Sequence, residues 1–367
     1  MTADVVIIGA GIVGAACADA LSRDGLRVTI IEPAMVGGGA TAAGMGHLLV
    51  LDDNEAEFAL TRYSRGLWNE LASEMPAEVE YDPCGTLWAA ADGEEMAAVH
   101  QKHAYYSSRG VRVETLDAKQ LAGAEPNLRP GMAGGLLIRD DALIYSPRAA
   151  LWFVERALAR GAMLLRGKRV AQIMDYGVRL EDGTHVDAAK IVCASGSWAT
   201  HLVSGLEIKP RKGHLVITDR YPGFVRHAVI ELGYLKSAHG SATESVAFNA
   251  QPRKTGQILI GSSRQFGVTD TGINAHMLTR MLQRAIEYMP AIAHLSVLRT
   301  WAGFRAATPD KLPIIGRLPD RPNAYIATGH EGIGITTSLG SAMILRDLIA
   351  GRAPAIDPAP YAVERFA

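Results

Sequence analysis

The amino-acid sequence predicts an α/β protein of two domains, one of which is assembled from separated segments of the chain. Three observations predict this fold: a strand, glycine turn, helix and strand in the first 32 residues; a second strand, glycine turn and helix near the C-terminus; and mixed short strands and helices between them. A chain of 367 residues is long enough for two domains with a sizeable core.

Composition excludes several classes of protein. The chain is 48% hydrophobic and 20% charged, with a formal net charge of −1, so it has no basic field to attract nucleic acid or an anionic membrane. The N-terminus lacks a cationic leader, and the long uncharged run over 33–51 is rich in glycine, which is typical of a loop rather than a membrane span. We therefore expect a cytoplasmic protein.

The first element is a strand, "DVVIIG", which leads directly into a glycine-rich turn and a helix. Gly9, Gly11 and Gly14 fit the pattern G-x-G-x-x-G, and Glu32 ends the next strand, "LRVTIIE". In this pattern the first glycine permits a tight turn, the second lets a pyrophosphate approach the backbone, and the third lets helix and strand pack closely. Exposed amides at the helix N-terminus attract phosphate, and the acid accepts hydrogen bonds from a ribose. The segment predicts a dinucleotide site without distinguishing NAD from FAD.

The next elements follow from hydrophobic periodicity and turn residues. We expect helices over 54–75 and 146–161, and a strand with its continuation in "AMLLRGKRVAQIM". A hairpin is expected around Asp182-Gly183, followed by an apolar strand over 190–194 that ends in Gly196.

The rest of the chain adds strand-like pieces, "GHLVITD" and "QILIGSSRQFG", a helix over 275–289 closed by Pro290, and a final strand, glycine turn and small-residue helix. The dinucleotide-binding domain is expected to comprise 1–76, 146–210 and 301–367, and the second domain 77–145 and 211–300. Cys17, Cys84 and Cys193 are far apart, which predicts neither a metal site nor a disulfide framework.

Five motifs appear in a characteristic order along the whole chain: the turn at 9–14, "GGGATAAGMGHL", "CASGSWA", "WAGFRAATPDKLPIIG" and "GHEGIGITTSLGSA". Together they resemble the D-amino-acid oxidase family of FAD-dependent oxidoreductases, which includes glycine oxidase and sarcosine oxidase. The wording is most similar to a bacterial subgroup of D-hydroxyproline dehydrogenase and the flavin subunits of opine oxidases and hydrogen cyanide synthase.

The resemblance implies a Rossmann-like FAD-binding domain of the glutathione-reductase-2 type and a substrate domain with a mixed sheet. FAD would bind non-covalently, with Ile12 and Val13 at its pyrophosphate, Glu32 at the adenosine ribose and Val170 at the adenine. Residues 330–336 would present amides and a helix N-terminus to the flavin pyrimidine. The positions implied for the cofactor are Gly9, Gly11, Ile12, Val13, Gly14, Glu32, Pro33, Ala40, Thr41, Ala43, Gly44, Met45, His47, Val170, Gly196, Trp198, His330, Glu331, Gly332, Ile333, Gly334, Ile335 and Thr336.

Arg305 stands among apolar and turn-forming residues, where a buried guanidinium is costly unless an anion meets it. The resemblance implies that Arg305 pairs with the substrate carboxylate; the alternative is a structural pair with a protein acid such as Asp310. Ala306 follows where many relatives have proline, and Glu331-Gly332 replace a second arginine of the glycine oxidase pattern. We expect a site with one arginine and hydroxyls, or one that accepts bulkier N-substituted substrates.

Five further side chains have both a functional and a structural interpretation. His47 is the most plausible polar neighbour of the flavin, or it packs within the loop. Tyr234 offers a hydroxyl from the second domain, or it belongs to the core. His330 is expected to order the last glycine turn, while Lys212 and His214 either lie near the domain junction or serve packing and solvation.

The resemblance implies hydride transfer from the α carbon of a D-amino or cyclic imino acid to flavin N5, which gives an imine. The first substrate expectation is cis-4-hydroxy-D-proline, followed by D-proline, opines, glycine or sarcosine. The acceptor is oxygen, a quinone, or a partner subunit with an iron–sulfur cluster. Two other hypotheses remain open: a flavin-bearing structural or sensing subunit without turnover, and an NAD-dependent dehydrogenase.

Overall fold

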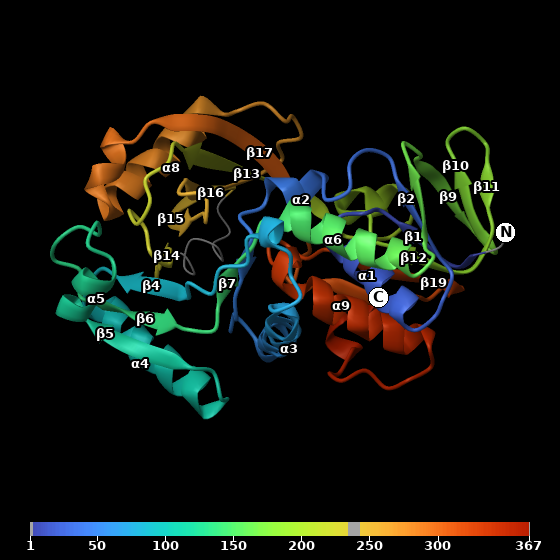
Figure 1. Cartoon of the computed structure of the whole chain (residues 1–367), viewed down its shortest axis with the longest axis horizontal. Helices are drawn as coiled ribbons and strands as arrows, with labels where there is room; N and C mark the ends of the chain where they lie inside the picture. The colour runs from blue at the N-terminus through green and yellow to red at the C-terminus, as the bar shows by residue number, and fades with distance from the viewer. Residues whose placement is uncertain (1–2, 234–242, 367) are drawn as a thin grey trace. The chain divides into compact units, whose positions relative to one another are not determined.

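The computed structural model describes residues 3–233 and 243–366 and divides the chain into two compact units (Figure 1). The sequence placed the breaks after 76, 145, 210 and 300, and the structure places them after 79, 144, 210 and 303. Unit 1 comprises Met1–Val79, Tyr145–Pro210 and Phe304–Ala367, and unit 2 comprises Glu80–Ile144 and Arg211–Gly303.

Unit 1 is built on a six-stranded sheet with the order β18-β19-β12-β1-β2-β8. Neighbouring strands are parallel except β18, which runs antiparallel to β19. The chain moves outward from β1 to β2 and β8, and then returns to β12 on the other side of β1, so the strand order reverses between β1 and β12. The strands are β1 Ala3–Ile8, β2 Val28–Glu32, β8 Met163–Arg166, β12 Ala188–Cys193, β18 Ile314–Leu318 and β19 Arg321–Thr328.

In unit 1, helices α6 (Ser146–Ala159) and α9 (Gly334–Ile349) both pack against α1 (Ile12–Arg23) (Figure 1). The small residues of "IVGAACADA" allow this close packing. Another helix, α3 (Glu55–Leu71), packs on α9, and a Cβ at Gly340 of α9 would lie 2.3 Å from Oγ of Ser64 in α3.

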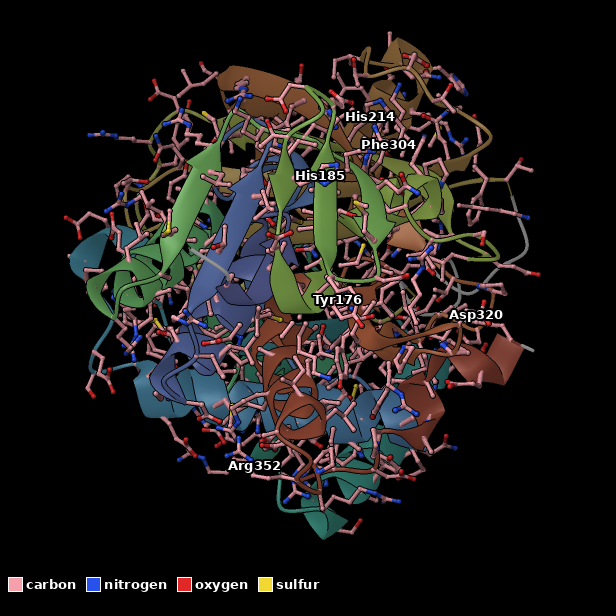
Figure 2. The ribbon with its side chains drawn as sticks, turned by 90° about the vertical axis from the view of Figure 1, so that its right-hand side faces the viewer. Tyr176, His185, His214, Phe304, Asp320 and Arg352 are labelled. Atoms are coloured by element: carbon pink, nitrogen blue, oxygen red, sulfur yellow. The ribbon has the colours of Figure 1, made fainter. Side chains whose placement is uncertain are left out.

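A small antiparallel sheet follows β8, and it confirms the hairpin expected around Asp182-Gly183. It comprises β9 (Val170–Met174), β10 (Gly177–Leu180) and β11 (His185–Val186), and Figure 2 shows His185 on β11 and Tyr176 in the turn before β10. The expectation of a strand continuing from 162 to 174 needs correction, because β8 and β9 belong to different sheets. Gly167, with φ of +75°, lies in the turn between them.

Unit 2 is built on an eight-stranded sheet with the order β17-β13-β16-β15-β14-β4-β6-β5. One face of this sheet packs on helix α8 (Ala275–Tyr288) through an apolar cluster that includes Phe248, Ala250, Met281 and Ala285. The strands are β4 Thr86–Ala90, β5 Val113–Asp117, β6 Gly134–Ile138, β13 Lys209–Thr218, β14 Ala228–Glu231, β15 Glu244–Pro252, β16 Ile258–Phe266 and β17 Val297–Ala307; the other helices are α4 Gly93–Ser108 and α5 Ala118–Ala124.

Two segments differ from the sequence expectation. The run 33–51, expected to be a loop, contains the short helix α2 (Gly39–Ala43) and the short strand β3 (His47–Leu48). The stretch around Arg305, expected to be rich in turns, begins as the end of the eleven-residue strand β17. Within the ranges 3–233 and 243–366, no helix is both long and apolar enough to cross a membrane.

Candidate cofactor and substrate site

Three parallel strands of unit 1 end at the same edge of the sheet. Gly9 follows β1, Gly196 follows β12 and Gly329 follows β19, and all three have positive φ angles of +100°, +57° and +73°. These turns lie where the strand order reverses, which is where open α/β sheets bind their ligands. The three glycine-containing segments predicted from the sequence therefore meet at one place.

The first glycine turn has no room for side chains. A Cβ at Gly9 would lie 2.7 Å from the carbonyl oxygen of Ala194, and a Cβ at Gly14 would lie 2.0 Å from the carbonyl oxygen of Gly9. Gly11 is the N-cap of α1, where no side chain of its own caps the helix. The turn therefore presents bare backbone and a helix N-terminus, which fits the pyrophosphate of a dinucleotide.

Glu32 ends β2 and is buried beside this turn. Its carboxylate accepts hydrogen bonds from the backbone N–H groups of Ala10 (2.8 Å) and Ala34 (2.9 Å), so it fastens the glycine turn to the end of β2 and to the residue after Pro33. Each carboxylate oxygen has a further lone pair, which leaves acceptor capacity for a ribose hydroxyl.

The segment that contains α2 packs against the start of α9. The Oγ1 of Thr41 accepts the N–H of Ile12 at 3.0 Å, which joins α2 to the first turn of α1. A Cβ at Gly44 would lie 2.8 Å from Cδ1 of Ile335. Thr336 donates its hydroxyl to the carbonyl oxygen of His47 at 2.9 Å. The segments around 12, 41–47 and 335–336, distant in sequence, are thus held together within unit 1.

Arg305 lies along the last glycine turn. The carbonyl oxygen of Ala306 accepts the N–H of Glu331 at 3.1 Å, and a Cβ at Gly332 would lie 3.3 Å from both Cδ and Nε of Arg305. Gly332 has a φ of +90° and Glu331 a φ of +32°, so the chain turns sharply here before α9 begins. Because position 332 has no side chain, the guanidinium stem can lie against the turn that leads into this helix.

The environment of Arg305 differs from the sequence expectation in one respect: the side chain is half-buried rather than enclosed. Asp310, the alternative partner, instead accepts hydrogen bonds from the guanidinium of Arg365, with Nε at 2.7 Å. This pairing lowers the pKa of Asp310, against the opposing effect of burial. The carboxylate of Asp310 is therefore already paired with Arg365, which also belongs to unit 1.

The N-terminus of α9 is a donor site. Its N-cap is Ile333, no side chain caps it, and its first turn contains no acid. The backbone N–H groups of Gly334, Ile335 and Thr336 therefore carry the partial positive charge of the helix dipole. This partial positive charge would stabilise the electron-rich edge of an aromatic ring placed at the N-terminus of α9.

Two histidines of the candidate set are neutral at pH 7. Desolvation lowers the pKa of His47 to about 3 and that of His330 to about 4. His330 Nε2 lies 3.0 Å from the hydroxyl of Ser341, and a Cβ at Gly334 would lie 3.1 Å from the His330 Cβ. His330 thus packs between the turn and α9, in agreement with the expectation that it orders the turn.

Gly196, Trp198 and Val170 lie at different parts of unit 1. Thr328 donates its hydroxyl to the carbonyl oxygen of Gly196 at 2.8 Å, so the turns after β12 and β19 are joined. Trp198 is 39% exposed and stacks on His201, with ring centroids 4.0 Å apart. Val170 is buried at the start of β9 within the apolar cluster that includes Ile8. Their cofactor contacts remain predictions.

The remaining sequence candidates do not belong to the described part of unit 1. Tyr234 lies outside the described residues. In unit 2, Lys212 pairs with Asp270 at 3.0 Å, and His214 Nδ1 lies 2.8 Å from the hydroxyl of Ser263. These contacts give both side chains a structural role within unit 2. Across residues 3–233 and 243–366, no cluster of His, Cys, Asp or Glu could hold a metal ion, and the three cysteines are free.

Sequence reasoning did not identify several residues that hold the site together. Ser146 donates its hydroxyl to the carbonyl oxygen of Thr41 at 2.9 Å, and Trp68 Nε1 donates to the carbonyl oxygens of Ile335 (3.2 Å) and Thr336 (3.0 Å). These side chains fasten the α2 segment and the first turn of α9. No motif marks them, because each acts on the backbone of a segment far away in the chain.

Comparisons with known proteins agree with this geometry. A family model described as "FAD dependent oxidoreductase" (DAO) matches residues 4–348. The chain is 27% identical to hydrogen cyanide synthase subunit HcnC of Pseudomonas aeruginosa, over 100% of this chain and 96% of that protein. It is 28% identical to glycine oxidase of Pseudomonas putida, over 99% of both chains.

Solved structures show the same fold. The crystal structure of glycine oxidase from Geobacillus kaustophilus matches with a TM-score of 0.89 and 26% identity, over 99% of this chain and 98% of that chain. The crystal structure of L-proline dehydrogenase from P. horikoshii also matches with a TM-score of 0.89, at 25% identity, over 100% of this chain and 98% of that chain.

Proposed function

Because the chain belongs to the DAO family of FAD-dependent oxidoreductases, we propose that it oxidises the carbon–nitrogen bond of an amino acid or cyclic imino acid. FAD is the cofactor of this family. Names among the similar proteins, glycine oxidase and L-proline dehydrogenase, support a substrate with an amine beside a carboxylate.

In this proposal the carboxyl edge of the unit 1 sheet holds FAD. The pyrophosphate binds at Gly11 and the first turn of α1, and a ribose binds at Glu32. The bare backbone of this turn supports the assignment, since a Cβ at Gly9 or Gly14 would collide with backbone atoms. When bound, FAD supplies a two-electron acceptor, and the uncapped first turn of α9 stabilises negative charge beside it.

The observation that carries the proposal is the position of Arg305 against the turn that leads into α9. Its Cδ and Nε approach Gly332, two residues before that helix begins. A planar guanidinium binds both oxygens of a carboxylate, which fixes the position of the neighbouring α carbon. Arg305 therefore acts as the substrate anchor next to the segment that stabilises the flavin.

The reaction needs a neutral amine more than a strong protein base, because the nitrogen lone pair assists the loss of hydride from the α carbon. His47 and His330 are neutral at pH 7, because desolvation lowers their pKa values to about 3 and about 4, so they neither repel a cationic amine nor supply a proton readily. Their roles in this proposal are orientation and packing. The substrate amine loses its proton to solvent before reaction.

Within the amino-acid class, the resemblance of the motifs to the D-hydroxyproline dehydrogenase subgroup supports cis-4-hydroxy-D-proline as the first candidate substrate. Glycine and sarcosine are the alternatives, and a second candidate is the flavin subunit of an opine oxidase-type complex. The electron acceptor in this proposal is oxygen, a quinone or another subunit.

The test is anaerobic mixing of the purified yellow protein with a panel of amino acids while the flavin absorbance near 450 nm is followed. We expect at least one of cis-4-hydroxy-D-proline, D-proline, sarcosine, glycine or an opine to bleach the flavin. Oxygen uptake measured beside reduction of an artificial dye then identifies the acceptor. A yellow protein that no member of the panel bleaches would contradict the proposed activity and favour a flavin-bearing subunit without turnover.

A further inference from the structure

A buried tryptophan of α3 bonds to the backbone of α9 within unit 1. Trp68 is fully buried, and its indole N–H donates to two carbonyl oxygens in the first turn of α9, those of Ile335 at 3.2 Å and Thr336 at 3.0 Å. In a helix, each such carbonyl already faces the backbone N–H four residues later. Trp68 therefore adds a donor to peptide groups that the helix itself would satisfy.

The position of this indole is fixed by contacts on two sides. Ser64, one turn before Trp68 on α3, accepts the backbone N–H of Gly340, one turn after Thr336 on α9, at 3.2 Å. Residues i and i+4 of one helix thus meet residues i and i+4 of the other. On α6, Phe153 packs on the Trp68 ring, with ring centroids 5.4 Å apart.

The peptide group between Ile335 and Thr336 joins the Trp68 contact to the N-terminal end of α9. Its carbonyl is that of Ile335, and its N–H is that of Thr336, one of the first three N–H groups, for which a helix has no acceptor of its own. The hydroxyl of Ser338 donates to the same carbonyl oxygen at 2.9 Å. Hydrogen bonds to a carbonyl oxygen polarise its peptide group, so the N–H at the other end becomes a stronger donor.

The side chain of Thr336 holds the same peptide group in place. Its Oγ1 donates to the carbonyl oxygen of His47 at 2.9 Å and accepts the N–H of Leu49 at 3.3 Å. This hydroxyl is thus engaged by β3 and the residue after it. Trp68, Thr336 and Ser338 are each 0% exposed, and hydrogen bonds are electrostatically stronger where water is excluded.

We propose that Trp68 is a positioning residue that sets how strongly the first turn of α9 favours the reduced flavin. This rests on the proposed function, in which that turn lies beside the flavin. Uptake of a hydride, which is two electrons and one proton, leaves one negative charge on the flavin ring, and donors aimed at that charge stabilise it. Trp68 acts on it through the peptide group of Ile335 and Thr336, and so raises the reduction potential.

The test measures the two-electron midpoint potential of the FAD-loaded protein beside a reference dye, with no amino acid present. Trp68→Phe replaces the indole by a smaller ring and removes the N–H. We expect the equilibrium constant for reduction to fall about 3- to 10-fold, which lowers the potential by about 15–30 mV at about 30 mV per tenfold change. The absorbance at 450 nm reports that FAD is still bound.

A second variant acts on the same carbonyl oxygen without altering α3. Ser338→Ala removes the other side-chain donor to Ile335, so it should also lower the potential. If Trp68→Phe does not fold or does not bind FAD, Ser338→Ala decides the test.

Trp152→Phe is the matched control. Trp152 lies on α6, and its ring also packs on Phe153, with centroids 5.1 Å apart. The equilibrium constant for reduction should stay within about 1.5-fold of that of the unmodified protein, or about 5 mV in potential.

A role in packing alone predicts a different result. Trp68→Phe would then lower the melting temperature, as Trp152→Phe does, and leave the potential unchanged. If Trp68→Phe and Ser338→Ala both keep the equilibrium constant for reduction within about 1.5-fold of the unmodified value, the role assigned to Trp68 is wrong.

Reduction by amino acids separates this failure from failure of the proposed function. Lowered potentials in both variants of a protein that no amino acid bleaches would reject the proposed activity and retain the role of Trp68. Bleaching by an amino acid together with unchanged potentials would retain the activity and reject that role. A protein that binds no FAD would reject both.

Discussion

At the scale of single residues, the most informative positions are those where a side chain is absent. The G-x-G-x-x-G spacing predicts Gly9, Gly11 and Gly14 from sequence alone, since each has a distinct role in one local turn. Gly332 is different: its lack of a side chain matters because Arg305 lies 3.3 Å from the place a Cβ would take. That contact joins β17 to the last glycine turn, and no local pattern predicts it.

Gly14→Ala should abolish tight FAD binding and destabilise the protein. The new Cβ would lie 2.0 Å from the carbonyl oxygen of Gly9, so backbone must move in the turn that receives the pyrophosphate. We expect a loss of roughly 1–3 kcal/mol in the free energy of unfolding, which is typical of overpacking, and a colourless purified protein. Urea unfolding and the absorbance at 450 nm measure the two effects.

Gly66→Ala is the matched control. Gly66 lies on an exposed position of α3, and a Cβ there would meet nothing within 4 Å. Alanine should therefore stabilise this helix by about 0.5–1 kcal/mol and leave the protein yellow. Equal FAD content in Gly14→Ala and Gly66→Ala would rule out the first turn as the pyrophosphate site.

At the scale of elements, the start of α3 combines a helix cap with a buried acid. Asn54 is the N-cap and accepts the backbone N–H of Glu57 at 2.8 Å. The carboxyl of Glu57 is buried near Asp53 and Asp52, and desolvation followed by these negative charges raises its pKa from 4.5 to about 8. Glu57 is therefore protonated in the folded protein at pH 7, while the unfolded chain has released that proton.

This pKa shift predicts that stability falls as pH rises. Between about pH 5 and pH 8 the native state holds a proton that the unfolded state lacks, so the contribution of Glu57 declines by up to about 1.4 kcal/mol per pH unit and levels off above pH 8. Glu57→Gln should remove this dependence, so the difference in unfolding free energy between the two proteins should grow with pH. Glu55→Gln, at an exposed position of the same helix, is the control. Parallel pH profiles for all three proteins would show that Glu57 titrates normally.

Elements with a strong local signal were predicted well, and those that depend on distant partners were not. The strand, turn and helix at residues 3–23 and the helix α6 follow from hydrophobic periodicity and from the glycine and proline residues near the helix ends. Periodicity does not predict that β8 and β9 belong to different sheets, because β8 joins its sheet by pairing with β2, whereas β9 pairs with β10. The short helix α2 was missed for the same reason: Thr41 gains its role from the N–H of Ile12 and the hydroxyl of Ser146.

At the scale of the whole molecule, the candidate cofactor site draws on segments spread over almost the entire chain. The order of motifs predicts which segments take part, because each ends a strand or begins a helix. The sequence cannot predict that Asn249 and Gln251 are buried in unit 2, since this follows from the pairing of β15 with β16. Among the residues that the structure describes, Oδ1 of Asn249 and both amide atoms of Gln251 are buried without a hydrogen-bond partner, which only the folded structure reveals.

Hydrogen exchange should reveal this discontinuous site directly. Addition of FAD to the apoprotein is expected to protect backbone amides in 9–14, 32–47, 196–198 and 329–336 together, because one ligand orders all four segments. The antiparallel hairpin over 177–186 contributes no residue to the proposed site and should exchange at the same rate with and without FAD. Protection confined to 9–14 would limit the site to the first turn.

The most direct test of the central claim compares the amino acid that reduces the flavin fastest with its own carboxamide. In the unmodified protein we expect the acid to reduce the flavin with an apparent second-order rate constant about 100-fold or more above that of the amide, because only the carboxylate pairs with the Arg305 guanidinium. In Arg305→Met, with FAD still bound, the two rate constants should differ by no more than about threefold. If Arg305→Met keeps the full preference for the acid, another group binds the carboxylate and the account of this site is wrong.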